Sequence, residues 1–381
     1  MKEQPYFWAL NMNYRKPKPY MFTKLSKVII LSFLFLFVLW HPNASAQDQE
    51  RKTMLNYYGA IEFTANRPNG PYNTFFTLGE QDFFITSRIT DRISFLGETV
   101  VKFDPKSGTT FSPSIERAQM KFDYYKNHSL IVGKIHSPVN YWNDVYHHGR
   151  VFFPTIDRPV AFSHFIPLHT LGARLMGQGL GKLNFGYDFV LGNGISSSDV
   201  FHEGPHFSAT SSVHIKPVDG LRLQASYYYD LLTKNAAGVH SGQINQPFDY
   251  KKDIRYNMVS TSIAYFGKKV EFLNESLYNF NYSDSLGRAN NYSSYTYLGF
   301  RLDDNRVPFM VFDVTSTDDE RELHISHVHR IQYGIGFRYE FSYLLNIKAQ
   351  FMRSGDFHKH GGSEVPELNK LYFKVQLAYG L

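Results

Sequence analysis

The sequence predicts an all-β fold, a transmembrane antiparallel β-barrel of sixteen strands, and three observations support this prediction. Hydrophobic residues recur with a period of two along most of the chain, whereas the 3.6-residue period of amphipathic helices is nearly absent. Phe and Tyr contribute 34 and 27 of the 381 residues, yet the long apolar run is confined to the N-terminal region. Short turns alternate with long polar loops, as they do in outer-membrane barrels.

Residues 1–46 have the features of a secretory signal peptide. Two lysines precede a short apolar run, and Ala44-Ser45-Ala46 follows it as an A-x-A cleavage site. The sequence therefore predicts cleavage after this site and a barrel domain over 47–381, with an uncleaved signal anchor as the alternative. Met21 is a second candidate start, which would make residues 1–20 an extension.

Composition excludes several classes of function. The chain contains no cysteine, which excludes disulfides, thiolate metal sites and thiol catalysis. The predicted signal peptide holds six basic residues and one acidic residue, so the net charge of +6 falls to about +1 for the remainder. The basic isoelectric point therefore gives no support for nucleic-acid binding, and no cofactor is expected.

Sixteen alternating segments are predicted as strands, and each is about long enough to cross a bilayer when tilted. The clearest is 221–230, where Leu, Ala and Tyr alternate with Arg, Gln, Ser and Asp, and the least clear is 269–281. The predicted strands are 54–65, 81–90, 92–103, 114–126, 128–136, 169–179, 182–192, 206–216, 220–231, 254–266, 269–281, 291–303, 306–314, 327–340, 343–354 and 370–381.

Seven short turns and eight long loops connect these strands, which puts both ends of the barrel domain on the short-turn side. A sheet in lipid must close on itself because lipid cannot pair with edge N–H and C=O groups. The last segment, 371–381, alternates to its final residue and resembles the C-terminal strand that the barrel-assembly machinery recognises. A soluble all-β protein is the alternative, although its long apolar edge would aggregate in water.

One face of each strand should line a water-filled lumen, and alternation places more basic than acidic side chains on that face. The mid-strand basic candidates are Arg117, Lys121, Arg174, Arg222, Arg338 and Lys374. A positive surplus in a narrow aqueous pore favours anions, whereas pairing with carboxylates would leave a polar wall without selectivity. The residues expected to face lipid include Phe122, Leu223, Phe300 and Phe373.

The longest predicted loop, 137–168, follows the fifth strand. Its aromatic content is too high for a disordered segment, so we expect it to fold inward and pack on the barrel wall. Its candidate constriction residues are Trp142, His147, His148, Arg150 and Arg158. Imidazole pairs can bind metals, but adjacent residues of a strand point to opposite faces, and we predict no metal site.

The start of this loop carries a motif that resembles a known family. It consists of Gly133-Lys134, His136, Pro138, Tyr141-Trp142-Asn143, His147-His148-Gly149 and Arg158-Pro159. The motif resembles the outer-membrane porin superfamily of Bacteroidota, related to the phosphate-selective type of porin.

This resemblance implies a Gram-negative outer-membrane location, contact with membrane lipid and a third loop that narrows the pore. It also implies passive diffusion of small hydrophilic solutes, anions above all, through either a monomer or a homotrimer. No enzyme activity is expected; an outer-membrane hydrolase and a non-conducting structural barrel are the alternatives.

Overall fold

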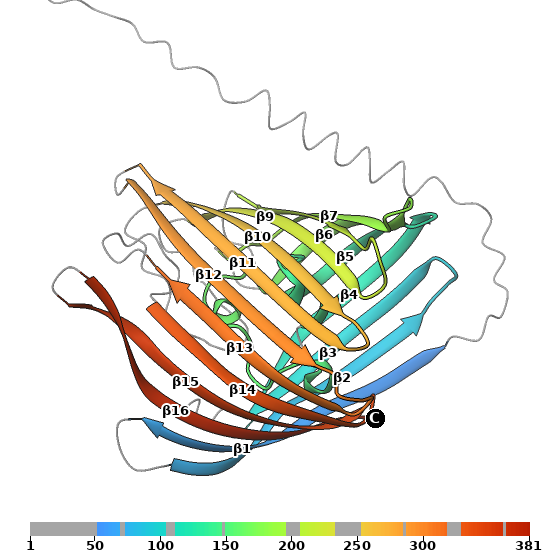
Figure 1. The fold of residues 1–381 in the computed structure, drawn as a ribbon. Coiled ribbons are helices and arrows are strands. Elements are labelled where there is room, and N and C mark those ends of the chain that lie inside the picture. The colour runs from blue at the N-terminus through green and yellow to red at the C-terminus, as the bar shows by residue number, and fades with distance from the viewer. Residues whose placement is uncertain are drawn as a thin grey trace, which may run out of the picture. The chain divides into compact units, whose positions relative to one another are not determined.

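The predicted sixteen-stranded antiparallel barrel is confirmed. The computed structural model describes residues 52–68, 73–103, 111–146, 149–195, 206–232, 253–284, 287–317, 329–360 and 363–381. Within these residues each strand pairs with its neighbour in sequence, and β1 pairs with β16 to close the sheet (Figure 1). The predicted signal peptide, 1–46, lies outside the described residues.

Most strands begin and end within a few residues of the predicted positions. Their bounds are β1 Thr53–Pro68, β2 Asn73–Arg88, β3 Ile93–Phe103, β4 Phe111–Tyr125, β5 His128–His136, β6 His169–Leu180, β7 Phe185–Gly192, β8 Ser208–Ile215, β9 Leu221–Leu232, β10 Ile254–Phe266, β11 Val270–Ser283, β12 Gly287–Phe300, β13 Arg306–Ser316, β14 His329–Ser342, β15 Leu345–His360 and β16 Ser363–Gly380.

Helical structure is limited to short turns in the loop between β5 and β6. These are η1 Trp142–Tyr146, η2 Arg150–Phe152 and η3 Val160–Ser163, drawn in green inside the barrel in Figure 1. No helix in the described part of the chain is long and apolar enough to cross a membrane.

Side chains alternate between the two faces of the sheet as the period of two predicts. In β10, Tyr256, Met258 and Ala264 are buried in the interior, whereas Val259 and Ile263 are exposed on the outer face. In a water-soluble sandwich the outward face of each strand is polar, so an exposed apolar outer face indicates a lipid environment.

The β1–β2 hairpin is longer than predicted, because β2 begins at Asn73 within a segment, 66–80, that was expected to be a loop. The pairing of the two strands shifts between Gly59 and Ile61. Around this bulge the consecutive residues 80–82 are all buried. A bulge breaks the period of two, so alternation could not indicate that the strand continues.

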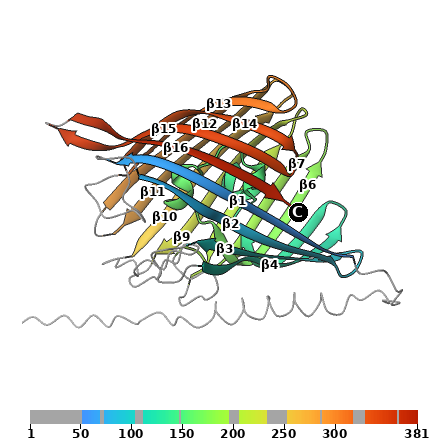
Figure 2. The same cartoon turned by 90° about the horizontal axis from the view of Figure 1, so that it is seen from below.

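The β15–β16 hairpin also extends beyond its predicted ends, into the segment 355–369 that was expected to be a loop. β15 ends at His360 and β16 begins at Ser363, and the hairpin projects past the neighbouring strands (Figure 2). Here too the pairing shifts, between Ser354 and Asp356.

The interior of β11–β13 is only partly polar, in contrast to the expectation. Besides acidic residues, the inward side chains of these strands include large apolar and aromatic ones, which are Leu273, Leu277, Tyr295, Tyr297 and Phe309. They face the loop between β5 and β6 rather than water. This explains why 269–281 alternates poorly, since both of its faces carry apolar residues.

Candidate functional site

The motif on which the family resemblance rests builds the base of the loop 137–168. Gly133 has φ 132°, and a Cβ there would lie 2.1 Å from the carbonyl oxygen of Ala118, so only glycine fits. Asn143 is fully buried, and its Nδ2 donates to the carbonyl oxygens of Ser137 (2.8 Å) and Leu168 (3.2 Å). One amide side chain thus ties the two ends of the loop together.

Four backbone N–H groups of the loop donate to side chains on four different wall strands. The bonds run from Trp142 to Glu275, from Gly149 to Asp82, from Ile156 to Gln350 and from Val160 to Asp313, at 2.7, 2.9, 3.0 and 2.7 Å. Because β2, β11, β13 and β15 lie around the barrel, these contacts carry the loop across the lumen. The expected inward folding is confirmed.

Trp142 is the centre of an apolar contact between the loop and the wall. Its ring is fully buried and lies 5.3 Å from the ring centroids of Tyr146 and Phe153 and 5.5 Å from that of Tyr295 on β12. Burying a large apolar side chain stabilises by about 1.5–3 kcal/mol. The predicted constriction residue Trp142 therefore acts as an anchor rather than as part of the lumen surface.

Asp144 joins two of the predicted pore-lining arginines. Its carboxylate lies 3.2 Å from Arg174 and 2.5 Å from Arg222, and Arg174 also contacts Asp188 at 2.7 Å. Burial alone would raise the pKa of Asp144, but the two guanidinium groups outweigh burial and hold this pKa below its ordinary value. The ionised carboxylate of this loop residue therefore lies between the basic side chains of β6 and β9.

Glu80 on β2 holds the two loop arginines. Arg158 donates through both terminal nitrogens to its carboxylate at 2.8 Å, and Arg150 donates at 3.1 Å. Burial lowers the pKa of Arg150, but Glu80 and nearby carboxylates outweigh it and raise this pKa. In the same region Lys374 of β16 pairs with Asp157 of the loop. These three predicted basic residues are thus brought together, each with a carboxylate partner.

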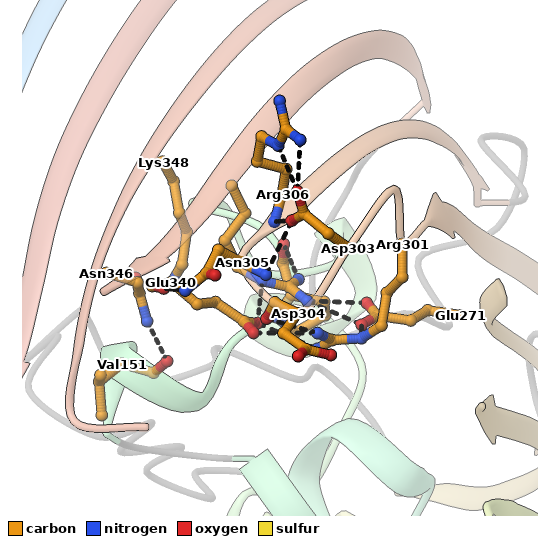
Figure 3. A network of polar contacts seen from close by, with 12 residues as sticks. Val151, Glu271, Arg301, Asp303, Asp304, Asn305, Arg306, Glu340, Asn346 and Lys348 are labelled. Atoms are coloured by element: carbon orange, nitrogen blue, oxygen red, sulfur yellow. Dashed lines mark hydrogen bonds and ion pairs between the residues drawn. The ribbon is translucent and has the colours of Figure 1, made fainter. Parts of the chain in front are cut away.

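A second charged cluster lies at the short-turn end of β11–β14 (Figure 3). Nη2 of Arg338 donates to both carboxylate oxygens of Glu271 at 2.9 Å, and Nε of Arg338 donates to Glu340 at 2.8 Å. Arg301 contacts Glu271 at 2.7 Å and Glu340 at 3.1 Å. Arg338 also donates to the carbonyl oxygen of Pro154, which connects this cluster to the loop.

The remaining predicted pore-lining residues, Arg117 and Lys121, lie on β4, away from these clusters. Arg117 pairs with the buried Glu98, and Lys121 lies 2.8 Å from Asp123. Every predicted basic site residue therefore has a carboxylate neighbour. The predicted loop residues His147 and His148 lie outside the described residues.

Several acidic residues of the interior were not predicted. Those on strands are Glu80, Glu116, Glu271, Glu275 and Asp313, and those on the loop are Asp144 and Asp157. They offset most of the positive surplus that alternation suggested. A bulge beside Glu98 places Glu116 in the interior together with its neighbour Arg117. The outward run of Val270, Phe272, Tyr278 and Phe280 is the sequence signal that could have placed Glu271 and Glu275 inside.

In the described part of the chain, no group of three His, Cys, Asp or Glu side chains could hold a metal ion. The histidine pair that faces the interior, His136 and His169, sits beside Glu98 and Glu116 at 3.7 and 2.9 Å. Both contacts lie within the wall.

No protein-family model and no curated protein matches the sequence. Solved structures do match it. An anion-selective porin from Comamonas acidovorans superposes with a TM-score of 0.60 at 8% identity, covering 87% of this chain and 99% of the other. The trimer form of OmpT, an outer membrane protein of Vibrio cholerae, gives 0.58 at 11% identity, covering 86% and 99%. OmpF of Salmonella typhi, in complex with daunomycin, gives 0.55 at 12% identity, covering 87% and 98%. At such low identity the likeness shows the fold, which is that of porin-like outer-membrane barrels.

Proposed function

We propose that this protein is an outer-membrane porin for the passive diffusion of small hydrophilic solutes. The observation that carries the proposal is the loop 137–168, which crosses the interior and is bonded to wall strands around the barrel. A loop fixed in this way narrows a lumen without closing off the charged wall beside it. The barrel fold, shared with porins from other bacteria, supports the same proposal.

In this proposal the solute path is bounded by partly exposed ion pairs. Lys374 and Asp157 keep about a quarter of their side chains exposed, and Lys121 and Asp123 keep more than a third. Such pairs offer donors and acceptors that replace part of a solute's hydration. The apolar contact around Trp142 keeps the loop in place, so the width of the path is set by packing.

We propose a weak anion preference. The basic residues Arg117, Arg174 and Lys374 each lie beside a carboxylate, so their fields are largely compensated. Arg150 and Arg158 support a residual positive potential, because both guanidinium groups donate to one carboxylate, that of Glu80. No preference for phosphate follows from these contacts.

The proposal includes location and assembly. Export would use the signal peptide 1–46, and the alternating C-terminal strand would be recognised by the barrel-assembly machinery. A homotrimer in the outer membrane is supported by the trimer form of the similar OmpT. Membership of the Bacteroidota porin superfamily rests on the loop-base motif, in which Gly133 and Asn143 have structural roles.

Single-channel recording in planar bilayers tests the proposal. We expect stepwise conductance and, in a salt gradient, a reversal potential of the sign given by a modest excess of chloride over potassium permeability. Steps with a preference for potassium would contradict the anion preference alone. Correctly folded protein without conductance would favour the non-conducting barrel, and turnover of lipid or ester substrates without conductance would favour the hydrolase.

A further inference from the structure

A recess of about 300 Å³ lies between the tip of the loop and the barrel wall at the short-turn end. Its walls include the aromatic rings of Tyr146 and Phe153 from the loop, Phe266 from β10 and Tyr343 from the β14–β15 turn. Its polar lining comes from the cluster of Glu271, Arg301, Arg338 and Glu340, seen in part in Figure 3. This volume is at the lower end of the range for small-molecule sites.

The aromatic side of the recess is already in place without a ligand. Phe266 stacks on Tyr141 at 6.2 Å with an interplanar angle of 20°, and meets Tyr146 edge-on at 6.1 Å and 89°. Tyr146 in turn contacts Trp142, the anchor of the loop. A ligand that stacks on Phe266 would therefore not have to order the ring first.

The polar side of the recess is charged but balanced. Arg301 and Glu340 form a two-point contact at 3.1 and 3.1 Å, and Arg338 and Glu271 form another at 2.9 and 2.9 Å. An anionic ligand group would face both carboxylates, and a cationic group would face both guanidinium groups. A charged ligand would have to break one of these pairs, whereas a hydroxyl can donate to a carboxylate and accept from a guanidinium while the pairs remain.

Asn346 also lines the recess. The Nδ2 atom of Asn346 donates to the carbonyl oxygen of Val151 at 2.6 Å, while its buried Oδ1 has no hydrogen-bond partner among the described residues. An unpaired buried acceptor is unfavourable, so a ligand hydroxyl that reached this oxygen would relieve the cost.

We propose that this recess binds a neutral, polyhydroxylated ring, such as one hexose unit of a carbohydrate. The apolar C–H face of the ring would lie on Phe266 and Tyr343, and its hydroxyls would bridge the Arg301–Glu340 pair. This binding goes beyond the proposed function, because it does not require that the barrel conducts.

The test uses three ligands that share one ring and differ in charge: methyl β-D-glucoside, methyl β-D-glucuronide and methyl β-D-glucosaminide. Binding is measured by titration calorimetry and ligand-observed NMR on the folded full chain in a detergent without sugar groups. We expect the neutral glucoside to bind with a dissociation constant of about 1 mM and the charged rings to bind less tightly. Binding of none of the three, or tighter binding of a charged ring, would overturn the proposal.

Two aromatic variants locate the binding. Phe266→Ala and Tyr343→Ala should each weaken glucoside binding by about three- to tenfold, as expected for the loss of one aromatic contact. Tyr125→Ala is the matched control, since Tyr125 is likewise exposed at a short turn and lies outside the recess. If Phe266→Ala does not fold, the 82% exposed Tyr343 decides the question. Glucoside binding that neither recess variant weakens would place it elsewhere and overturn the proposal.

A charge variant tests the balanced lining. Glu340→Gln leaves Arg301 with one carboxylate fewer, so we expect glucuronide affinity to rise by at least about tenfold. Asp303→Asn is the matched control, because Asp303 pairs with Arg306 in the adjacent turn, outside the recess. Unchanged glucuronide affinity in Glu340→Gln would show that this pair does not touch the ligand. Since binding is measured without a membrane, its failure is distinct from a failure to conduct.

Discussion

Two sections of the lumen wall hold the same loop by different means. The apolar section on β11–β13, formed by Leu273, Leu277, Tyr295, Tyr297 and Phe309, packs against Trp142 and its neighbours, and two carboxylates beside it accept backbone hydrogen bonds from the loop. The charged section, formed by Glu80 and Asp82 on β2 and Lys374 on β16, holds the loop through ion pairs and one backbone hydrogen bond. Apolar burial supplies most of the free energy but little direction, whereas the ion pairs fix position and place charges beside water. The apolar section therefore anchors the loop, whereas the charged section provides the groups that contact solutes.

The largest expected effect is on the apolar section. Trp142→Ala should lower the free energy of unfolding by about 3–5 kcal/mol, because it removes the ring that contacts Tyr146, Phe153 and Tyr295 and leaves a cavity under the loop. The loop should then move, giving larger and noisier single-channel conductance. Urea unfolding and bilayer recording measure the two effects. Phe152→Ala is the control, since Phe152 is 46% exposed at the edge of the same loop. Equal losses in both variants would contradict the anchoring role.

On the charged side, Asp144→Asn should cost about 3 kcal/mol of unfolding free energy. The change leaves Arg222 buried without its carboxylate, while Arg174 keeps Asp188. Urea unfolding at pH 7 measures this loss. Asp144→Asn behaving like the wild-type protein would mean that the loop does not need this ion pair.

The stability difference between the wild-type protein and Asp144→Asn should also depend on pH. The pKa of Asp144 in the folded protein is below its unfolded value of about 3.9. The stabilisation is therefore fully present above about pH 4 and is lost as the pH falls through the folded pKa. The gap in unfolding free energy between wild type and Asp144→Asn should be complete at pH 7 and should narrow at pH 3. A gap that is constant over this range would contradict the assignment.

Neutralising the basic side chains of β4 should have a small effect on selectivity. Arg117→Gln together with Lys121→Gln should lower the chloride-to-potassium permeability ratio by less than about twofold, since both side chains lie beside carboxylates. Reversal potentials in a salt gradient measure the ratio. Arg306→Gln is the control, because Arg306 is exposed at a short turn and pairs with Asp303. A rise in the ratio would contradict the positive contribution of β4.

The smallest expected effect on stability is for the ion pair in the turn between β12 and β13. Arg306 holds the pKa of Asp303 below its ordinary value, yet both side chains are exposed. Solvent and salt screen such a pair, so Asp303→Asn should leave the unfolding midpoint in urea unchanged. A midpoint shift as large as that of Asp144→Asn would remove the distinction between buried and exposed pairs.

The fold could be predicted almost completely from the sequence, because a membrane barrel imposes a period of two on every strand. The site could be predicted only in part. Alternation placed Arg222 and Lys374 on the inner face, where they contact the loop. It missed Glu116, since a bulge lets two consecutive residues share a face. It also missed Asp144, because no periodicity relates a loop residue to the distant strands that it contacts.

The size limit for solute passage tests the central claim most directly. Liposomes containing the wild-type protein should swell in a hexose, less in a disaccharide and not in a trisaccharide, because the loop 137–168 narrows the lumen. A double variant, Trp142→Ala with Phe153→Ala, should admit the trisaccharide, since both rings belong to the anchor of that loop. Equal size limits for the two proteins, or no swelling of wild-type liposomes in a hexose, would contradict the account.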